Sequence, residues 1–396
     1  MLRLGIQPRL SEPMATVFID RQYDLNTVAN QILSVKGVES VKRIEKAWGI
    51  YVKASLWSVF SEIRNIPGVI EIKPGYEYGD AENINNYYNM EHPPLGKYIL
   101  MLSMATIGDS PVGWRIPGMI SGGILCIVVG LIAREATRRD IYALLASILA
   151  ASDPLIRNMA GIAMLDIYLS LFTSVSIYMA LRGSWILTGI FLGLAVSTKM
   201  SGAFVILPLI IITIIRNRSL TKIYRDLVII PGIVFIALSL PLIYLFGLQS
   251  WYDQSIAGAI SWHLKTKTAP GEGPPVSAPW MWLYGDNPFY LTVSPDTIAR
   301  GNIYVYLGSI ALSAALLPAA RFFTCISMIT ISTYMTWLGY VILWLAGNHS
   351  QYSFYMIQLS PLFSALFITQ LWILLENTDI VIRSYPRRSR LSPASN

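Results

Sequence analysis

Long apolar runs separated by short polar segments make up most of the chain after Lys97. A helix rises 1.5 Å per residue, so about 20 apolar residues cross a hydrocarbon core of about 30 Å. The pattern therefore predicts about nine transmembrane helices, at residues 114–133, 141–159, 162–181, 185–198, 201–215, 228–248, 303–319, 323–346 and 353–375. The pair that flanks Lys199 is short, and the alternative is one bent or re-entrant segment. The apolar stretch from Tyr98 to Ile107 is too short to span and is expected to lie along the membrane surface.

The first 75 residues have a different pattern, with short alternating runs and two helical repeats. Strands are predicted at Ala15–Asp20, twice within Val38–Ala54, and at Val69–Ile72. The apolar positions of the two helices are Leu25, Val28, Ala29, Ile32 and Leu33, and then Leu56, Val59, Phe60 and Ile63. The order β-α-β-β-α-β predicts a small α+β domain of the ferredoxin-like type.

Composition supports a membrane protein, because 54% of the residues are hydrophobic and only 13% are charged. The net charge of +7 is concentrated in short loops and the tail, which is the positive-inside pattern and argues against nucleic-acid binding. The basic clusters are Arg134, Arg138 and Arg139, then Arg216, Arg218, Lys222 and Arg225, then Arg383, Arg387, Arg388 and Arg390. With nine crossings in the cell membrane, the N-terminal domain is extracytoplasmic and the C-terminus cytoplasmic.

We therefore predict an extracytoplasmic domain at residues 1–82, a transmembrane domain at 83–376 with a long outer loop at 249–302, and a basic cytoplasmic tail at 377–396. A signal peptide or apolar span that would export the first domain does not precede it. We expect that this segment lies upstream or is supplied by a separate chain. Cys126 and Cys325 both lie in apolar runs, which indicates neither a disulfide framework nor a thiolate zinc site.

The predicted outer face carries the unusual polar residues. Glu91 and His92 precede two prolines, which stiffen the backbone where the soluble domain meets the membrane. The structural interpretation is a rigid hinge, and the functional one is a fixed acid and imidazole beside a lipid-borne phosphate. Arg115 lies at the outer end of a span, where it either snorkels to the interface or binds phosphate through its guanidinium fork.

Three further charges lie at the outer ends of predicted spans. Arg157 and Asp166 flank an outer turn, and Lys199 lies between two apolar runs. One interpretation of Asp166 is a simple helix cap. The other is a functional role, because ionisable residues at membrane depth are costly and are functional candidates by default. In the long outer loop, His263, Trp280 and Trp282 are candidates for sugar or peptide contact, although interfacial anchoring also explains the aromatic residues.

Several motifs in order resemble the protein O-mannosyltransferase family of the GT-C glycosyltransferase superfamily. They are HPPLGK at 92–97, GWR at 113–115, MLDIYL at 164–169, STKMSG at 197–202, SAPWMWL at 277–283 and QYSFYM at 351–356. The resemblance implies a GT-C-like membrane fold and an enzyme, a dolichyl-phosphate-mannose-type mannosyltransferase. Such an enzyme moves mannose, with inversion, from a polyprenyl-phosphate sugar donor to Ser or Thr hydroxyls of an acceptor protein.

The resemblance also assigns roles. Glu91, His92 and Asp166 match catalytic positions, and Arg115 and Lys199 match phosphate-binding positions, with Arg157, His263, Trp280 and Trp282 as further substrate contacts. A divalent metal held by Glu91 with His92 or His263 is compatible with the resemblance but not required by it. The family has a first transmembrane helix and an Asp-Glu pair ahead of HPPLGK, and this sequence has neither. A transferase with a lipid or glycan acceptor, and a non-catalytic membrane subunit, are the alternatives.

Overall fold

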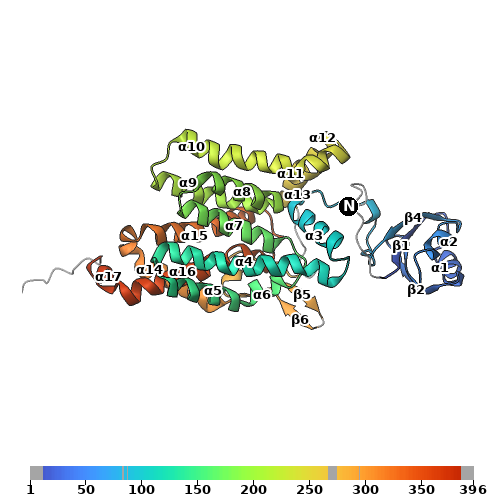
Figure 1. The fold of residues 1–396 in the computed structure, drawn as a ribbon, viewed down its shortest axis with the longest axis horizontal. Helices are drawn as coiled ribbons and strands as arrows, with labels where there is room; N and C mark the ends of the chain where they lie inside the picture. The colour runs from blue at the N-terminus through green and yellow to red at the C-terminus, as the bar shows by residue number, and fades with distance from the viewer. Residues whose placement is uncertain (1–11, 83, 87, 266–273, 294, 385–396) are drawn as a thin grey trace, which may run out of the picture. The chain divides into compact units, whose positions relative to one another are not determined.

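The computed structural model describes residues 12–82, 84–86, 88–265, 274–293 and 295–384, and Figure 1 shows their arrangement. The chain divides into two compact units, which are described separately. One comprises Met1–Asn89 with Leu100–Trp114, and the other comprises Met90–Ile99 with Arg115–Asn396.

The first unit contains a four-stranded antiparallel sheet in the order β2-β3-β1-β4. The element order β1-α1-β2-β3-α2-β4 is the one expected from the sequence. The elements are β1 (Met14–Ile19), α1 (Leu25–Ser34), β2 (Val38–Ile44), β3 (Gly49–Ala54), α2 (Val59–Ile63) and β4 (Val69–Pro74). Asp24 caps α1, because its carboxylate accepts a hydrogen bond from the Thr27 amide at 2.8 Å.

Both helices of this unit pack on one face of the sheet, where Val17, Ile32 and Ile63 belong to one buried cluster. Phe18, Ile44 and Ala47 form a smaller cluster. Leu33 and Leu56, which were expected on the buried helical faces, are exposed at 49% and 64%. Leu56 precedes the first turn of the short helix α2, so its side chain does not share the buried face of that helix.

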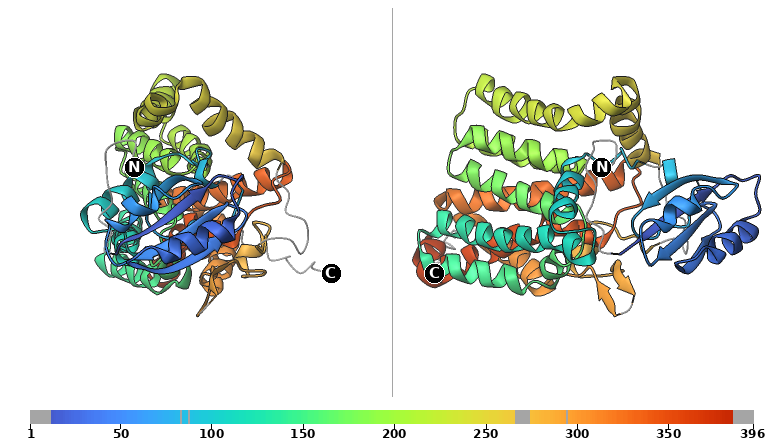
Figure 2. Two further views of the ribbon diagram at one scale, coloured as in Figure 1. Left: turned by 90° about the vertical axis from the view of Figure 1, so that its right-hand side faces the viewer. Right: turned by 45° about the vertical axis from the view of Figure 1, so that its right-hand side comes forward.

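The second unit is helical, and its helices lie side by side in Figure 2. The helices after the first domain are α3 (Leu95–Thr106), α4 (Pro111–Thr137), α5 (Asp140–Ser152), α6 (Pro154–Ala160), α7 (Asp166–Leu181), α8 (Trp185–Thr198), α9 (Ile206–Ile215), α10 (Leu220–Tyr224), α11 (Ile230–Phe246), α12 (Leu248–Trp251), α13 (Gly258–Lys265), α14 (Ile303–Leu316), α15 (Thr324–Leu345), α16 (Ser360–Glu376) and α17 (Thr378–Ser384). Two short segments matter for the site, η3 (Met200–Val205) and η8 (Ser353–Gln358). A hairpin of β5 (Tyr290–Val293) and β6 (Asp296–Ile298) lies in the predicted outer loop.

Within the described residues, four helical segments are long and apolar enough to cross a membrane. They are Pro111–Thr137, Leu220–Phe246, Ile303–Phe322 and Thr324–Leu345. A fifth is obtained if α16 and α17, which meet at an 88° bend, form one broken span. Several apolar helices are shorter, α7 and α8 among them, so the protein is a polytopic membrane protein while the nine predicted crossings remain a prediction.

A glycine allows close helix packing within the helical unit. A Cβ at Gly130 of α4 would lie 2.7 Å from the Ala143 carbonyl oxygen of α5. A Cβ at Gly96 of α3 would lie 2.6 Å from Leu165, just before α7. The Gly130 contact is with backbone and is shorter than any Cβ tolerates, so α4 and α5 approach because that side chain is absent. At Gly96 the contact is with the end of the flexible Leu165 side chain, which could move.

Candidate functional site

The break between α8 and η3 places Lys199 inside the helical unit. The backbone at Lys199 is extended, with φ −156° and ψ 139°, and its side chain turns inward and is 10% exposed. Gly202 makes this turn possible, because a Cβ there would lie 2.6 Å from the backbone of Ala195. The sequence prediction of an interruption at this lysine is therefore confirmed by the helix boundaries.

Lys199 forms a buried ion pair with Asp166 in the first turn of α7. Its Nζ donates to Asp166 Oδ1 at 2.8 Å, and the Asp166 side chain is only 5% exposed. The same ammonium lies 3.9 Å from the centre of the Tyr355 ring and 5.4 Å from that of Phe354. A cation on an aromatic face away from water is stabilised by up to about 2 kcal/mol. Two segments, α7 and η8, therefore hold the charge of Lys199.

Hydrogen bonds fix η8 beneath the lysine. The Gln358 amide donates to the Thr173 hydroxyl of α7 at 3.1 Å and to the Ser201 carbonyl of η3 at 3.3 Å. The Tyr340 hydroxyl of α15 donates to the Gln358 side-chain oxygen. Because Gln358 is fully buried, these bonds link η8 to three other segments and orient Tyr355.

Glu91 and His92, just before α3, lie close enough to Lys199 and Asp166 for the charges of that ion pair to act on the imidazole. Burial, together with the charges of Lys199 and Lys97, lowers the pKa of His92 to about 4, although Glu91 and Asp166 act in the opposite direction. Lys97 donates to the His92 carbonyl at 3.0 Å, and burial lowers the pKa of its ammonium to about 8. At neutral pH the imidazole is therefore uncharged, among two acids and two lysines.

Trp282 joins this cluster from the outer loop. It is 2% exposed, and its ring lies edge-on to Tyr340 at 5.2 Å and to Tyr355 at 6.2 Å. Its indole donates to the Ser277 carbonyl at 3.1 Å, which fixes the ring. We call the group Glu91, His92, Lys97, Asp166, Lys199, Trp282 and Tyr355 the lysine cluster.

The other predicted site residues are not part of the lysine cluster. Arg115 and Arg157 are exposed and form no ion pair with the described residues. Trp280 is 40% exposed and packs against Trp344 instead. The side chain of His263 lies outside the described residues. No group of three or more His, Cys, Asp and Glu side chains suits a metal within the described part of the chain.

Sequence reasoning missed Tyr355, Lys97 and Asp153. Tyr355 and Lys97 lie within the motifs quoted above, but a motif does not show where a side chain points. Asp153 is 1% exposed and caps α6 through the Leu155 amide at 2.8 Å. Its second oxygen accepts from Ser360 at 2.8 Å and from Tyr306 at 3.1 Å, so one carboxylate joins the starts of α6, α14 and α16. Only long-range packing could reveal this role.

The fold of the chain has a counterpart among solved structures. ArnT from Cupriavidus metallidurans bound to undecaprenyl phosphate superposes with a TM-score of 0.50 and 15% sequence identity, over 75% of this chain and 52% of ArnT. At that identity the similarity concerns the fold alone.

The sequence comparisons show which proteins the chain resembles. Residues 91–244 match the family model described as dolichyl-phosphate-mannose-protein mannosyltransferase, and the predicted resemblance to that family is confirmed. This chain is 26% identical to the polyprenol-phosphate-mannose–protein mannosyltransferase of Corynebacterium glutamicum, over 62% of this chain and 59% of that protein. The corresponding protein of Mycolicibacterium smegmatis is 25% identical, over 37% of this chain and 34% of its own length. The chain thus spans less than two thirds of these relatives.

Proposed function

We propose that the chain is a membrane mannosyltransferase that uses a polyprenyl-phosphate sugar donor and glycosylates Ser or Thr hydroxyls of proteins by inversion. The lysine cluster carries this proposal. It joins five predicted site residues. Four of them, Glu91, His92, Asp166 and Lys199, lie within the segment that matches the family model, and the fifth is Trp282.

Lys199 is the proposed contact for the lipid phosphate. When the bond between sugar and phosphate breaks, negative charge grows on the phosphate, and a positioned cation stabilises it. Asp166 is proposed to position this lysine, because it is paired with the ammonium and turned away from solvent. Lys97 supplies a second ammonium, which donates to the His92 carbonyl at 3.0 Å.

Glu91 is the proposed acid–base group of this chain. The acceptor hydroxyl must lose a proton as it attacks the anomeric carbon, and a positioned carboxylate contributes about 10²–10⁴-fold to such a step. Asp166 is less suited to this task because Lys199 Nζ already occupies its Oδ1 at 2.8 Å. Neutral His92 lies beside Glu91 and can donate or accept a hydrogen bond at neutral pH.

The aromatic residues of the lysine cluster are proposed to contact the sugar. Tyr355 and Trp282 present ring faces and edges beside Lys199, and flat rings pack against the apolar face of a hexose. Arg115, Arg157, His263 and Trp280 remain predicted contacts for the parts of donor and acceptor beyond the lysine cluster.

The orientation in the membrane is also part of the proposal. Asp166 begins α7, whereas Arg182 follows its last residue. Arg216 donates to the Leu181 carbonyl at 2.9 Å, and Arg218 and Arg225 both pair with Asp226. The basic residues thus gather at the end of α7 that lies away from Asp166, and the positive-inside rule places that end in the cytoplasm. The lysine cluster and the N-terminal domain, which we class as ferredoxin-like, then lie outside.

The experiment is transfer of labelled mannose from polyprenyl-phosphate mannose to an acceptor peptide, using membranes that contain the full chain. We expect Lys199→Met to lower kcat/KM at least a hundredfold, because the charge on the leaving phosphate loses its contact. Lys222→Met removes an equally charged but exposed lysine and serves as the matched control. Equal transfer by both variants, or transfer from a sugar nucleotide instead, would refute the assignment.

A further inference from the structure

A cavity of about 210 Å³ lies between the ends of α4 and α7, at the end of α7 opposite Asp166. Its lining residues are Leu131, Arg134, Glu135, Arg138, Tyr178 and Arg182. Sixteen helical residues of α7 separate this end from the lysine cluster, which is about 24 Å. Three guanidinium groups and one carboxylate give the lining an excess of positive charge.

The cavity lies where a bilayer would present its headgroups. α4 is long and apolar enough to cross a membrane, and no charged residue occurs in it between Arg115 and Arg134. Eighteen intervening residues correspond to about 27 Å of helix, close to the thickness of the hydrocarbon core. Arg134 and Arg138 therefore lie at the boundary where lipid phosphates lie.

The guanidinium groups retain free donors for a ligand. Arg134 pairs through Nε with Asp140, and Arg138 pairs through one terminal nitrogen with Glu135, while both side chains stay more than half exposed. Exposed pairs of this kind contribute at most about 1 kcal/mol, so an anion competes with them. Arg182 has no acidic partner among the described residues, and only the Tyr178 hydroxyl lies near it, at 3.4 Å.

The backbone at Arg138 gives a second, independent observation. Its φ is +57°, in the left-handed region that glycine favours and that costs other residues about 1 kcal/mol or more. A helix end of this type usually carries glycine. An arginine in this strained position, with its side chain on a cavity, is typical of a functional constraint.

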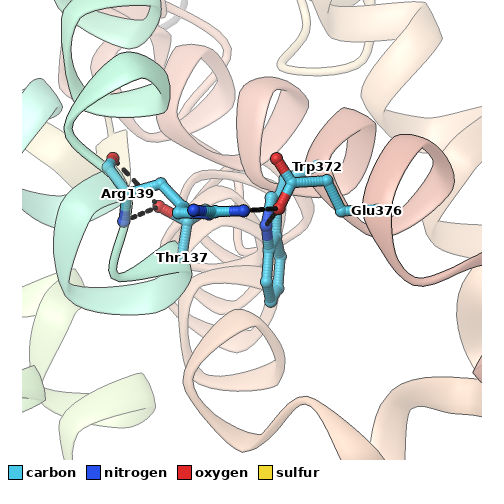
Figure 3. Close-up of polar contacts among 4 residues, drawn as sticks. All are labelled: Thr137, Arg139, Trp372 and Glu376. Carbon is cyan, nitrogen blue, oxygen red and sulfur yellow. Dashed lines mark hydrogen bonds and ion pairs between the residues drawn. The ribbon is translucent and has the colours of Figure 1, made fainter.

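The neighbouring Arg139 shows what a structural arginine looks like at the same turn. Figure 3 shows it directed at α16, where Nε and a terminal nitrogen lie 3.2 and 3.1 Å from one Glu376 oxygen. The Trp372 indole donates to that oxygen as well, at 3.1 Å. Arg139 does not line the cavity, so it provides a matched control of equal charge one residue away.

We propose that this cavity binds the phosphodiester headgroup of an anionic phospholipid, with Arg182, Arg138 and Arg134 as the phosphate contacts. The fork of a guanidinium fits two phosphate oxygens, and three such groups around one cavity exceed what general attraction to a membrane surface requires. A phosphatidylcholine headgroup carries a cation as well, which the arginines repel. The site therefore selects net negative headgroups.

The test titrates the purified full chain, in a neutral detergent, with phosphatidylglycerol or phosphatidylcholine and counts bound lipids by native mass spectrometry. We expect one phosphatidylglycerol to bind at least tenfold more tightly than phosphatidylcholine. Arg182→Gln weakens that binding about tenfold or more, because a hydrogen bond to a charged group is lost. Arg182→Lys keeps the charge but loses the fork, and gives an intermediate loss.

Arg139→Gln separates a built site from a basic surface, and it is expected to change lipid affinity less than twofold. An equal loss in Arg139→Gln and Arg182→Gln would overturn the proposal, and so would equal affinity for the two lipids. Inorganic phosphate forms a separate arm of the titration. Saturation by millimolar phosphate without binding of phosphatidylglycerol would show a site for a free anion and refute a lipid site.

Discussion

The ion pair between Asp166 and Lys199 is expected to contribute to stability only as a pair. Their side chains are 5% and 10% exposed and meet at 2.8 Å, so removal of either partner leaves a buried charge without compensation. Such removal typically costs about 3–5 kcal/mol, whereas replacement of both charges by neutral groups is often nearly neutral. Asp166→Asn and Lys199→Met should therefore each destabilise the protein more than the double variant does.

The two single variants differ in how the remaining charge is accommodated. Asp166→Asn leaves an ammonium that still lies 3.9 Å from the Tyr355 ring, which is worth up to about 2 kcal/mol. Lys199→Met leaves a carboxylate in the first turn of α7, where the helix dipole compensates part of its charge.

The assay is unfolding of the purified protein in mixed micelles, titrated with a denaturing detergent, for the wild type, both single variants and the double variant. A double-mutant cycle then isolates the coupling energy between the two side chains. We expect coupling of about 2 kcal/mol or more. A double variant that loses the full sum of the single effects would show that the two charges do not interact, and would refute the reasoning.

Three further predictions concern His92, Gly130 and Asp153. Burial lowers the pKa of His92 from 6.5 to about 4, so between these pH values the unfolded chain binds a proton that the folded protein does not. The free energy of unfolding should therefore fall by about 2 kcal/mol from pH 7 to pH 5. Thermal unfolding of His92→Gln should show less of this acid sensitivity. Gly130→Ala should cost about 1–3 kcal/mol because its Cβ would meet α5, whereas Gly123→Ala, with nothing within 4 Å, should be neutral or stabilising; the two melting temperatures test this contrast. Asp153→Asn should cost about 2–3 kcal/mol, since buried donors lose a charged acceptor, and an unchanged melting temperature would contradict the network.

Local patterns in the sequence were sufficient for the elements of the fold. Alternating and helical repeats located the four strands and two helices of the first unit, and apolar runs located the membrane helices. The predicted ends of the helices were less accurate. Leu56 fits the helical repeat in the sequence, but in the structure it precedes the first turn of α2. Helices such as α7 and α8 are shorter than a span, so apolar runs alone did not define how many helices cross the membrane.

The candidate site was predictable where charge at membrane depth marks it. Asp166 and Lys199 were selected separately for that reason, and the structure pairs them. Tyr355 and Asp153 could not be predicted, because an aromatic residue in a motif and a helix cap look ordinary until distant segments pack against them. Arg115 has the right residue type, but it is exposed and makes no ion pair with the described residues.

The most direct measurement is the affinity of the full chain for undecaprenyl phosphate compared with undecaprenol, in the wild type and in Lys199→Met. If Lys199 contacts the lipid phosphate, the wild type should prefer the phosphorylated lipid by about ten- to a hundredfold, as expected for a hydrogen bond to a charged group. Lys199→Met should lose most of that preference while its affinity for undecaprenol stays the same. The same preference in Lys199→Met and the wild type would contradict the assignment of the lysine cluster as the phosphate site.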